Sequence, residues 1–472
     1  MASAPPISGS VGEQPVSQLG SVQTEMQRLL KAGICLFSSN EEGQALAAFK
    51  KAYRLSGSLP EPRSQAKCLF NLGAAYIATG KPQKGLKCLL KAKELGAEEK
   101  DGDFSFNVGA AYDDMREYAK AAEFYGKAIQ EYSTNQTQSA ADALIKLAYC
   151  LVSTGDIESA AQSFRLAGQS YQRVQLPEEA AMAMREAANY FLRSPVYSPD
   201  DILESLQACS RLCTKIKNQE LLGKLYNHLG LHYAEMRCFR QAEQHFDAAL
   251  RLCSGKGFSV RKKAVLLQNL GAACNALECF ERALRYHSEA ADMYGALGER
   301  AAQAQCHYNL ATAHGQLKNY DMARFYSQQA LKAFVDAGDS YGEAQACEQL
   351  GMTHLCQGHF GPAIRYYKQA LALFEKSKEA SEIPRKRIWE KLAAVANYQA
   401  NAEDEFADSA ITDVRMAGEC GGGANICTNA AAVLGPPGPF RLLLLAPACL
   451  AIGSNGQLAQ VAPAEFTPTF HP

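Results

Sequence analysis

The amino-acid sequence predicts an all-α protein, a right-handed α-solenoid of about nine helix-hairpin repeats followed by a C-terminal capping helix. Three observations predict this fold. A small residue that follows an apolar one returns every 36 to 42 residues along the 472-residue chain. Apolar residues are spaced three and four apart on either side of a short break, as on two successive helices. A lone helix pair cannot cover its apolar face, so units of this period stack into an array.

The first repeats show the pattern most clearly. The stretch "FNLGAAYIATGKPQKGLKCLLKA" at 70–92 is echoed by "FNVGAAYDDMREYAKAAEFYGKA" at 106–128. Gly73 and Gly85 indicate a close crossing of two helices, where a longer side chain would not fit, and Leu89 fills the adjacent gap. The small residue that anchors the first helix of each repeat is found at Gly33, Gly73, Gly109, Ala148, Ala188, Gly230, Gly271, Ala311 and Gly351.

The chain divides into segments in the following order. Residues 1–22 are rich in Ser, Gly and Pro, and we expect them to be disordered. Repeats 1–4 occupy residues 23–180, a degenerate repeat 5 occupies 181–222, and repeats 6–9 occupy 223–376.

The fifth repeat departs most from the pattern. Its stretch "RSPVYSPDD" at 193–201 contains Pro195 and Pro199, which exclude a continuous helix. The interruption is either a lengthened turn within one repeat or a joint between two sub-arrays.

Two segments follow the last repeat. Residues 382–400 are amphipathic, contain the single tryptophan, Trp389, and are expected to form the capping helix that covers the last repeat. Residues 401–472 are of low complexity and are expected to be disordered. Their apolar run at 440–453 carries Arg441 and a proline and is shorter than the ~20 residues that a spanning helix needs, so no membrane span is predicted.

Composition excludes several classes of partner. Lys and Arg number 48 against 49 Asp and Glu, and no like-charge block exceeds 385–387, so neither a nucleic acid nor a membrane surface is an expected partner. The 16 cysteines are scattered without a CxxC pair, which is typical of reduced core thiols. The N-terminus lacks a basic region followed by an apolar run, so we expect a cytoplasmic protein.

The sequence offers no active site, and we expect a non-enzymatic protein without catalytic residues, metal ligands or cofactors. His228 and His232 are four residues apart, but residue 229 is Leu, so the HExxH arrangement is missing. The stretch "GKGFSV" at 255–260 lacks the spacing of a phosphate-binding loop. His314 and His354 stand where other repeats place a tyrosine, which favours a role in helix packing.

The repeat resembles the tetratricopeptide repeat over residues 26–376, on stretches such as "FNLGAAY", "LLGKLYNHLGLHYAEM" and "QACEQLG". Its period near forty is similar to that of the long-repeat subgroup of Leu-Gly-Asn repeat adaptors. The resemblance implies that one side of each first helix faces a concave groove. Chaperone-binding members carry a two-carboxylate clamp there, but the corresponding pairs in this chain are apolar, so binding to chaperone tails is not expected. These pairs are Leu30/Ile34, Phe70/Ala74 and Phe106/Ala110.

A polar residue recurs immediately before the Leu-Gly pair. It is Asn71, Asn107, Asn269 or Asn309 in four repeats, and His228 and Gln349 in two others. Such side chains can pair with the backbone of a bound peptide. Alternatively, each Asn satisfies a neighbouring loop or faces water. Partner preference would be set by the residues between these positions, Lys67, Phe70, Asp103, Phe106, Asp113, Asp114, Lys224, Gln268 and Tyr308.

The sequence therefore predicts an adaptor that binds a peptide or protein segment in the concave groove. The alternative is a structural scaffold or self-associating array that acts through its convex face or its capping helix. The sequence does not identify the partner.

Overall fold

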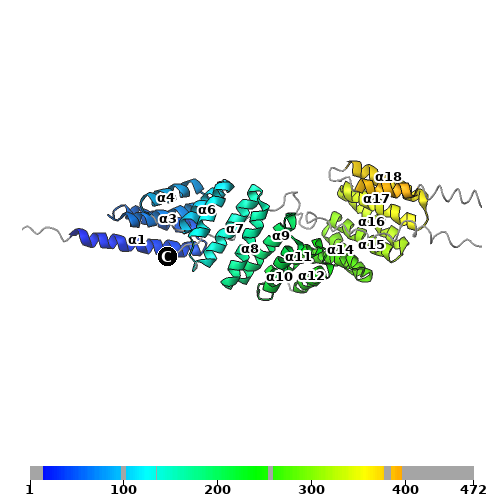
Figure 1. Cartoon of the computed structure of the whole chain (residues 1–472), viewed down its shortest axis with the longest axis horizontal. Coiled ribbons are helices and arrows are strands. Elements are labelled where there is room, and N and C mark those ends of the chain that lie inside the picture. Colours follow the sequence, from blue (N-terminus) through cyan, green and yellow to red (C-terminus); the bar gives the residue numbers. More distant parts are fainter. Residues whose placement is uncertain (1–13, 97–101, 134, 254–258, 377–383, 396–472) are drawn as a thin grey trace, which may run out of the picture. The chain divides into compact units, whose positions relative to one another are not determined.

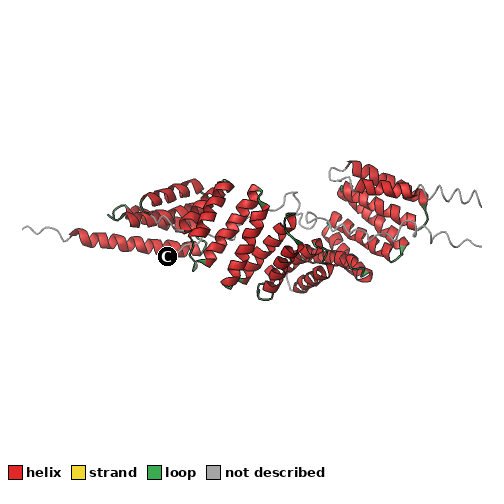
Figure 2. Ribbon diagram, in the orientation of Figure 1, coloured by secondary structure: helices red, strands yellow, loops and turns green. Residues whose placement is uncertain are grey.

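The computed structural model describes residues 14–96, 102–133, 135–253, 259–376 and 384–395. Throughout these residues the regular structure is α-helix, and none of them lies in a strand (Figure 2). The chain divides into two units, and the boundary lies between Ile216 and Lys217. The fold is the predicted all-α array of helix hairpins.

Unit 1 consists of five consecutive hairpins (Figure 1). Its helices are α1 (Gln14–Ser38), α2 (Glu42–Ser56), α3 (Pro62–Ala78), α4 (Pro82–Glu94), α5 (Gly102–Asp114), α6 (Tyr118–Glu131), α7 (Thr137–Thr154), α8 (Ile157–Arg173), α9 (Pro177–Arg193) and α10 (Pro199–Cys213).

Unit 2 consists of four hairpins and one further described helix at 384–395. Its hairpins are built from α11 (Gln219–Glu235), α12 (Phe239–Leu252), α13 (Val260–Ala276), α14 (Phe280–Leu297), α15 (Arg300–Gln316), α16 (Tyr320–Ala337), α17 (Ser340–Cys356) and α18 (Phe360–Lys376).

Each glycine anchor of a first helix lies against one large side chain of the second helix. A Cβ atom added to Gly230 would lie 2.5 Å from the Phe246 ring, and one added to Gly351 would lie 2.7 Å from the Tyr367 ring. Phe246 and Tyr367 are themselves fully buried. The predicted reason for the small residues, a close helix crossing, is confirmed.

In every hairpin except that of repeat 5, the turn has a left-handed backbone seven residues after the anchor. Gly80, Gly155 and Gly358 fill this position in three repeats, but residues such as Arg116 and Lys318 adopt the same positive φ elsewhere. A positive φ strains the backbone of any residue other than glycine. The recurrence of such residues shows that the helix crossing, and not local preference, sets the turn.

Repeat 5 cannot form this turn because Pro195 occupies the position, and proline is confined to negative φ. The chain instead runs through a longer connection from Arg193 to Pro199, where Ser198 and Asp201 form a capping box that starts α10. The turn within the repeat is therefore lengthened, and the boundary between the units follows α10.

The N-terminal expectation needs a correction. Helix α1 begins at Gln14, so residues 14–22, expected to be disordered, are helical. Pro15 lies in the first turn of the helix, where a backbone N–H would have no partner within the helix in any case. Composition alone therefore gave a wrong prediction for residues 14–22. Residues 1–13 and 401–472 lie outside the described residues.

The helix at 384–395 packs on the last hairpin. Ile388 and Val395 are buried in one cluster with residues of α17 and α18, whereas Trp389 is 59% exposed. Arg387 and Lys391 both contact the carboxylate of Glu348 on α17. Apolar contacts and an ion cluster together hold this helix in place, while the remainder of 382–400 lies outside the described residues.

The seventh repeat buries a histidine at the position where the sixth and ninth repeats bury Phe246 and Tyr367. His287 on α14 is fully buried against Gly271, and its Nε2 atom lies 3.4 Å from the Nδ2 atom of Asn275. Burial lowers the pKa of His287 to about 3, because the cation would lose its water. The native state therefore holds a neutral imidazole in its core.

We expect Gly230→Ala to destabilise unit 2 by about 1–3 kcal/mol, because the new methyl group would collide with Phe246. Gly223→Ala on the same helix is the matched control, since nothing lies within 4 Å of its added Cβ. Alanine is the better helix former, so the control should gain about 0.5–1 kcal/mol. Urea unfolding measures both, and equal effects would contradict the close crossing.

The buried imidazole predicts a dependence of stability on pH. Below pH ~6.5 the unfolded chain takes up a proton that native His287 refuses until about pH 3. The free energy of unfolding should therefore fall by about 1.4 kcal/mol per pH unit below that point, from this residue alone. His287→Phe should remove this part of the slope in urea titrations at pH 7.5 and 5.5. An unchanged slope would show that the imidazole titrates normally in the folded state.

Candidate peptide-binding surface

The residues expected to contact a partner all lie on first helices of hairpins. Lys67, Phe70 and Asn71 lie on α3 and Phe106 and Asn107 on α5, all in unit 1. In unit 2, the candidates are Lys224 and His228 on α11, Asn269 on α13, Tyr308 and Asn309 on α15, and Gln349 on α17.

The recurring amides are buried. Asn107 is 1% exposed and Asn309, the most accessible of the five, is 7% exposed. In unit 1 each amide bonds to its own helix one turn back. Asn71 Nδ2 donates to Lys67 O at 3.0 Å, and Asn107 Nδ2 donates to Asp103 O at 2.8 Å.

In unit 2 two of the amides join successive first helices, whereas Asn309 Oδ1 accepts a hydrogen bond from Gln305 Nε2 on its own helix at 3.4 Å. Asn269 Nδ2 on α13 donates to Asn227 Oδ1 on α11 at 3.2 Å. Gln349 Nε2 on α17 donates to Thr312 Oγ1 at 2.7 Å and to Tyr308 O at 3.3 Å, both on α15. Such bonds set how one hairpin stacks on the next.

The burial shows that these amides do not face water, and their bonds show that helix packing uses the position. The sequence pattern located the column of amides, but not its bonds between helices, because partners some forty residues away are invisible in a single repeat. A direct role of these amides in recognition stays a prediction.

The other candidates differ in accessibility. Lys67 and Lys224 are exposed, and Phe70, His228 and Tyr308 are partly buried. Phe106 is different, because it is 3% exposed and packs edge-on against Tyr125 of α6, with ring centres 5.3 Å apart. Phe106 therefore belongs to the core of unit 1.

A second polar column lies one residue before the amides, three residues before the anchor. It consists of Asn227 on α11, Gln268 on α13 and Tyr308 on α15, all partly buried. The sequence singled out Gln268 and Tyr308 but missed Asn227, which a strict count of offsets would have found. We call these three residues the outer column.

The outer column does not continue on α17. The residue at the same offset on α17, Glu348, is buried beneath the helix at 384–395, where Arg387 Nη2 and Lys391 Nζ lie 2.6 and 2.8 Å from its carboxylate oxygens. Burial alone would raise the pKa of Glu348, but Lys391 and Arg387 outweigh burial and hold that pKa below its usual value. Glu348 is therefore occupied within the chain.

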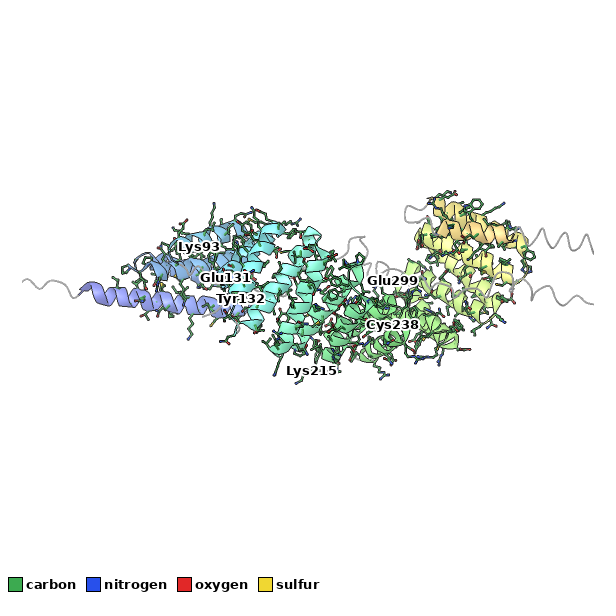
Figure 3. The ribbon with its side chains drawn as sticks, in the orientation of Figure 1. Lys93, Glu131, Tyr132, Lys215, Cys238 and Glu299 are labelled. Carbon is green, nitrogen blue, oxygen red and sulfur yellow. The ribbon has the colours of Figure 1, made fainter. Side chains whose placement is uncertain are left out.

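Carboxylates on and near α5 in unit 1 also accept hydrogen bonds from within the chain. Asp103 accepts a hydrogen bond from the Tyr132 hydroxyl at 2.9 Å, and Glu131 accepts one from Ser105. Figure 3 labels Glu131 and Tyr132. Burial raises the pKa of Asp113, and Lys146 on α7 only partly offsets this effect. Asp114, beside it, is exposed.

Little in the described residues suggests a catalytic or metal-binding site. They contain no group of three or more His, Cys, Asp or Glu side chains that could hold a metal ion. Burial raises the pKa of Cys68 to about 11 and of Cys347 to about 12, so these thiols are poor nucleophiles. His314 and His354 stack on tyrosines of their own hairpins at 5.4 and 5.5 Å, in helix-packing positions.

No helix among the described residues is long and apolar enough to cross a bilayer.

Two segments match models of the tetratricopeptide repeat, residues 66–96 and residues 262–334. Several solved structures are similar. The apo form of RapI is 13% identical over 74% of this chain and 98% of its own, with a TM-score of 0.49. BtubC from P. vanneervenii is 19% identical over 51% and 91%, with a TM-score of 0.33. YrrB, described as a TPR protein with an unusual peptide-binding site, is 18% identical over 44% and 96%, with a TM-score of 0.31. At these identities and TM-scores, the similarity does not indicate what this chain binds.

We expect Gln349→Ala to lower the stability of unit 2 by about 1–3 kcal/mol, because its partners on α15 would lose their bonds inside the protein. Gln329→Ala on α16 is the matched control, since Gln329 is exposed, and it should change stability by less than about 0.5 kcal/mol. Thermal and urea melts of both variants test this. Equal stability of the two would mean that the amide column contributes nothing to stacking.

Proposed function

Because the chain carries tetratricopeptide repeats, a repeat class that builds protein-interaction scaffolds, we propose that it is a non-enzymatic adaptor that binds a peptide or protein segment along its first helices. The observation that supports this most is the outer column of Asn227, Gln268 and Tyr308. It places amide and hydroxyl groups at one offset on three consecutive first helices, where water still reaches them.

The chemistry of the outer column suits a polypeptide backbone. Amides both donate and accept hydrogen bonds, as a peptide backbone does in every residue whatever its sequence. Burial raises the pKa of Tyr308, so its hydroxyl remains a donor at neutral pH. Partial burial strengthens such bonds, because the surroundings polarise less than water.

The amide column beneath supplies rigidity. Bonds from Asn269 to Asn227 and from Gln349 to the backbone of Tyr308 hold two members of the outer column in place before any partner arrives. A surface ordered in advance loses less entropy on binding. Lys224 and His228, on the same helix as Asn227, would then select among partner side chains.

The cysteines support a reducing compartment, and we place the adaptor in the cytoplasm. Every one of the thirteen cysteines that the structure describes is free. Disulfides are rare in the cytosol, where thiols are kept reduced.

A self-associating scaffold remains the second candidate, and one observation favours it. Met322 and Phe325 are three residues apart on α16 and are 42% and 49% exposed. Two apolar side chains on one face of a second helix could join copies of the chain. Light scattering across a range of concentrations separates the candidates, since the adaptor should stay monomeric.

We expect Gln268→Ala and Tyr308→Phe each to weaken binding by roughly 2- to 12-fold, the equivalent of one lost hydrogen bond. Proximity labelling with the full chain in cells would supply the partner, and calorimetry would measure its affinity. The melting temperature should not change, and Gln329→Ala should bind as the parent does. The proposal fails if both variants keep full affinity, or if they lose it only by unfolding.

A further inference from the structure

Unit 1 carries a strong local excess of positive charge, although the whole chain is nearly neutral. Between Glu42 and Glu94, from α2 to α4, ten lysines and arginines stand against three glutamates. Helix α4 alone holds four lysines and one glutamate. Charge interactions are screened beyond about 8 Å in physiological salt, so the local excess decides what this surface attracts.

The cations gather on one surface. Lys84, Lys87 and Lys91 follow each other at helical spacing on α4, and all three are exposed. Lys51 and Arg54 are exposed on α2. We call these five residues the basic face.

A direct contact shows that the two helices present this surface side by side. Lys91 Nζ lies 3.5 Å from the hydroxyl of Tyr53 on α2. Lys93, labelled in Figure 3, lies instead toward α5, and its Nζ is 5.9 Å from the centre of the Phe104 ring.

The basic face lacks carboxylate partners within the part of the chain that the structure describes, where no ion pair involves any of its five residues. Second helices of other hairpins pair their cations internally, as Lys127 does with Glu123 on α6 at 2.7 Å and Arg324 with Asp321 on α16 at 3.0 Å. Unpaired like charges on one surface repel one another, and an anionic partner would relieve that repulsion.

The residue types distinguish among anionic partners. Protein interfaces favour arginine and are poor in lysine, but all four cations of α4 are lysines. Leu90 protrudes among them at 48% exposure, an apolar group that a phosphate backbone would not use. Cations spread over two helices around an apolar side chain fit a planar layer of anionic head groups.

We propose that the basic face binds the surface of an anionic lipid bilayer. The lysine ammonium groups attract the head groups, and Leu90 enters the boundary between head groups and acyl chains. The first-helix surface of the proposed adaptor is made by different helices, so this inference does not depend on that proposal.

The test uses the full chain and sedimentation with vesicles of phosphatidylcholine, with or without phosphatidylserine. The chain should pellet only with the anionic vesicles, and added salt should release it. The triple variant Lys84→Gln, Lys87→Gln, Lys91→Gln should bind roughly 100-fold more weakly, at about fivefold per lysine. Its melting temperature should match the parent, because all three side chains are exposed.

A control variant removes the same charge elsewhere. Lys318→Gln, Lys332→Gln and Lys368→Gln change three exposed lysines of unit 2 and should leave vesicle binding intact. The proposal is overturned if the parent ignores anionic vesicles or if both triple variants lose binding equally. It is also overturned if the basic face binds an acidic peptide or a nucleic acid more tightly than the vesicles.

Discussion

The contact between a glycine anchor on one helix and a bulky side chain on the next controls the structure of the hairpins that contain it. Gly230 against Phe246 and Gly109 against Tyr125 are separated by the same sixteen residues. Because the backbones approach closely there, the turn between them must be short, and one residue of that turn must adopt a left-handed backbone. The strained turn at Arg116 is a consequence of this contact, whereas Pro195 imposes a longer connection on the fifth repeat.

Stacking of one hairpin on the next depends on a different kind of interaction. Side-chain amides on the first helices of unit 2 bond across to the preceding helix, as Asn269 does to Asn227. Buried polar groups are costly unless paired, so these bonds favour one arrangement over others that would bury the same apolar area. An array that is ordered in this way can present the outer column without a further loss of entropy.

Whole-chain averages conceal two local features of this protein. A net charge close to zero is compatible with a basic face of five cations, because acidic residues elsewhere balance the total. Likewise, an ordinary apolar content is compatible with a neutral histidine buried at a position that the sixth and ninth repeats give to Phe246 and Tyr367. The basic face comes from two repeats and the buried histidine from one, so neither feature appears in the repeat pattern of the whole chain.

The sequence by itself determined the repeat, its length and the positions of its small anchors, since close packing leaves no alternative to Gly or Ala where two backbones cross. It also located the amide column and most of the outer column, because periodic positions repeat their environment. Only the tertiary structure decided which of these polar residues are buried. The partners of Gln349 and Glu348 lie about forty residues away on other helices, and a bond between helices leaves no trace in the pattern of either one. Composition misjudged residues 14–22 for a different reason, because Pro15 is tolerated in the first turn of a helix.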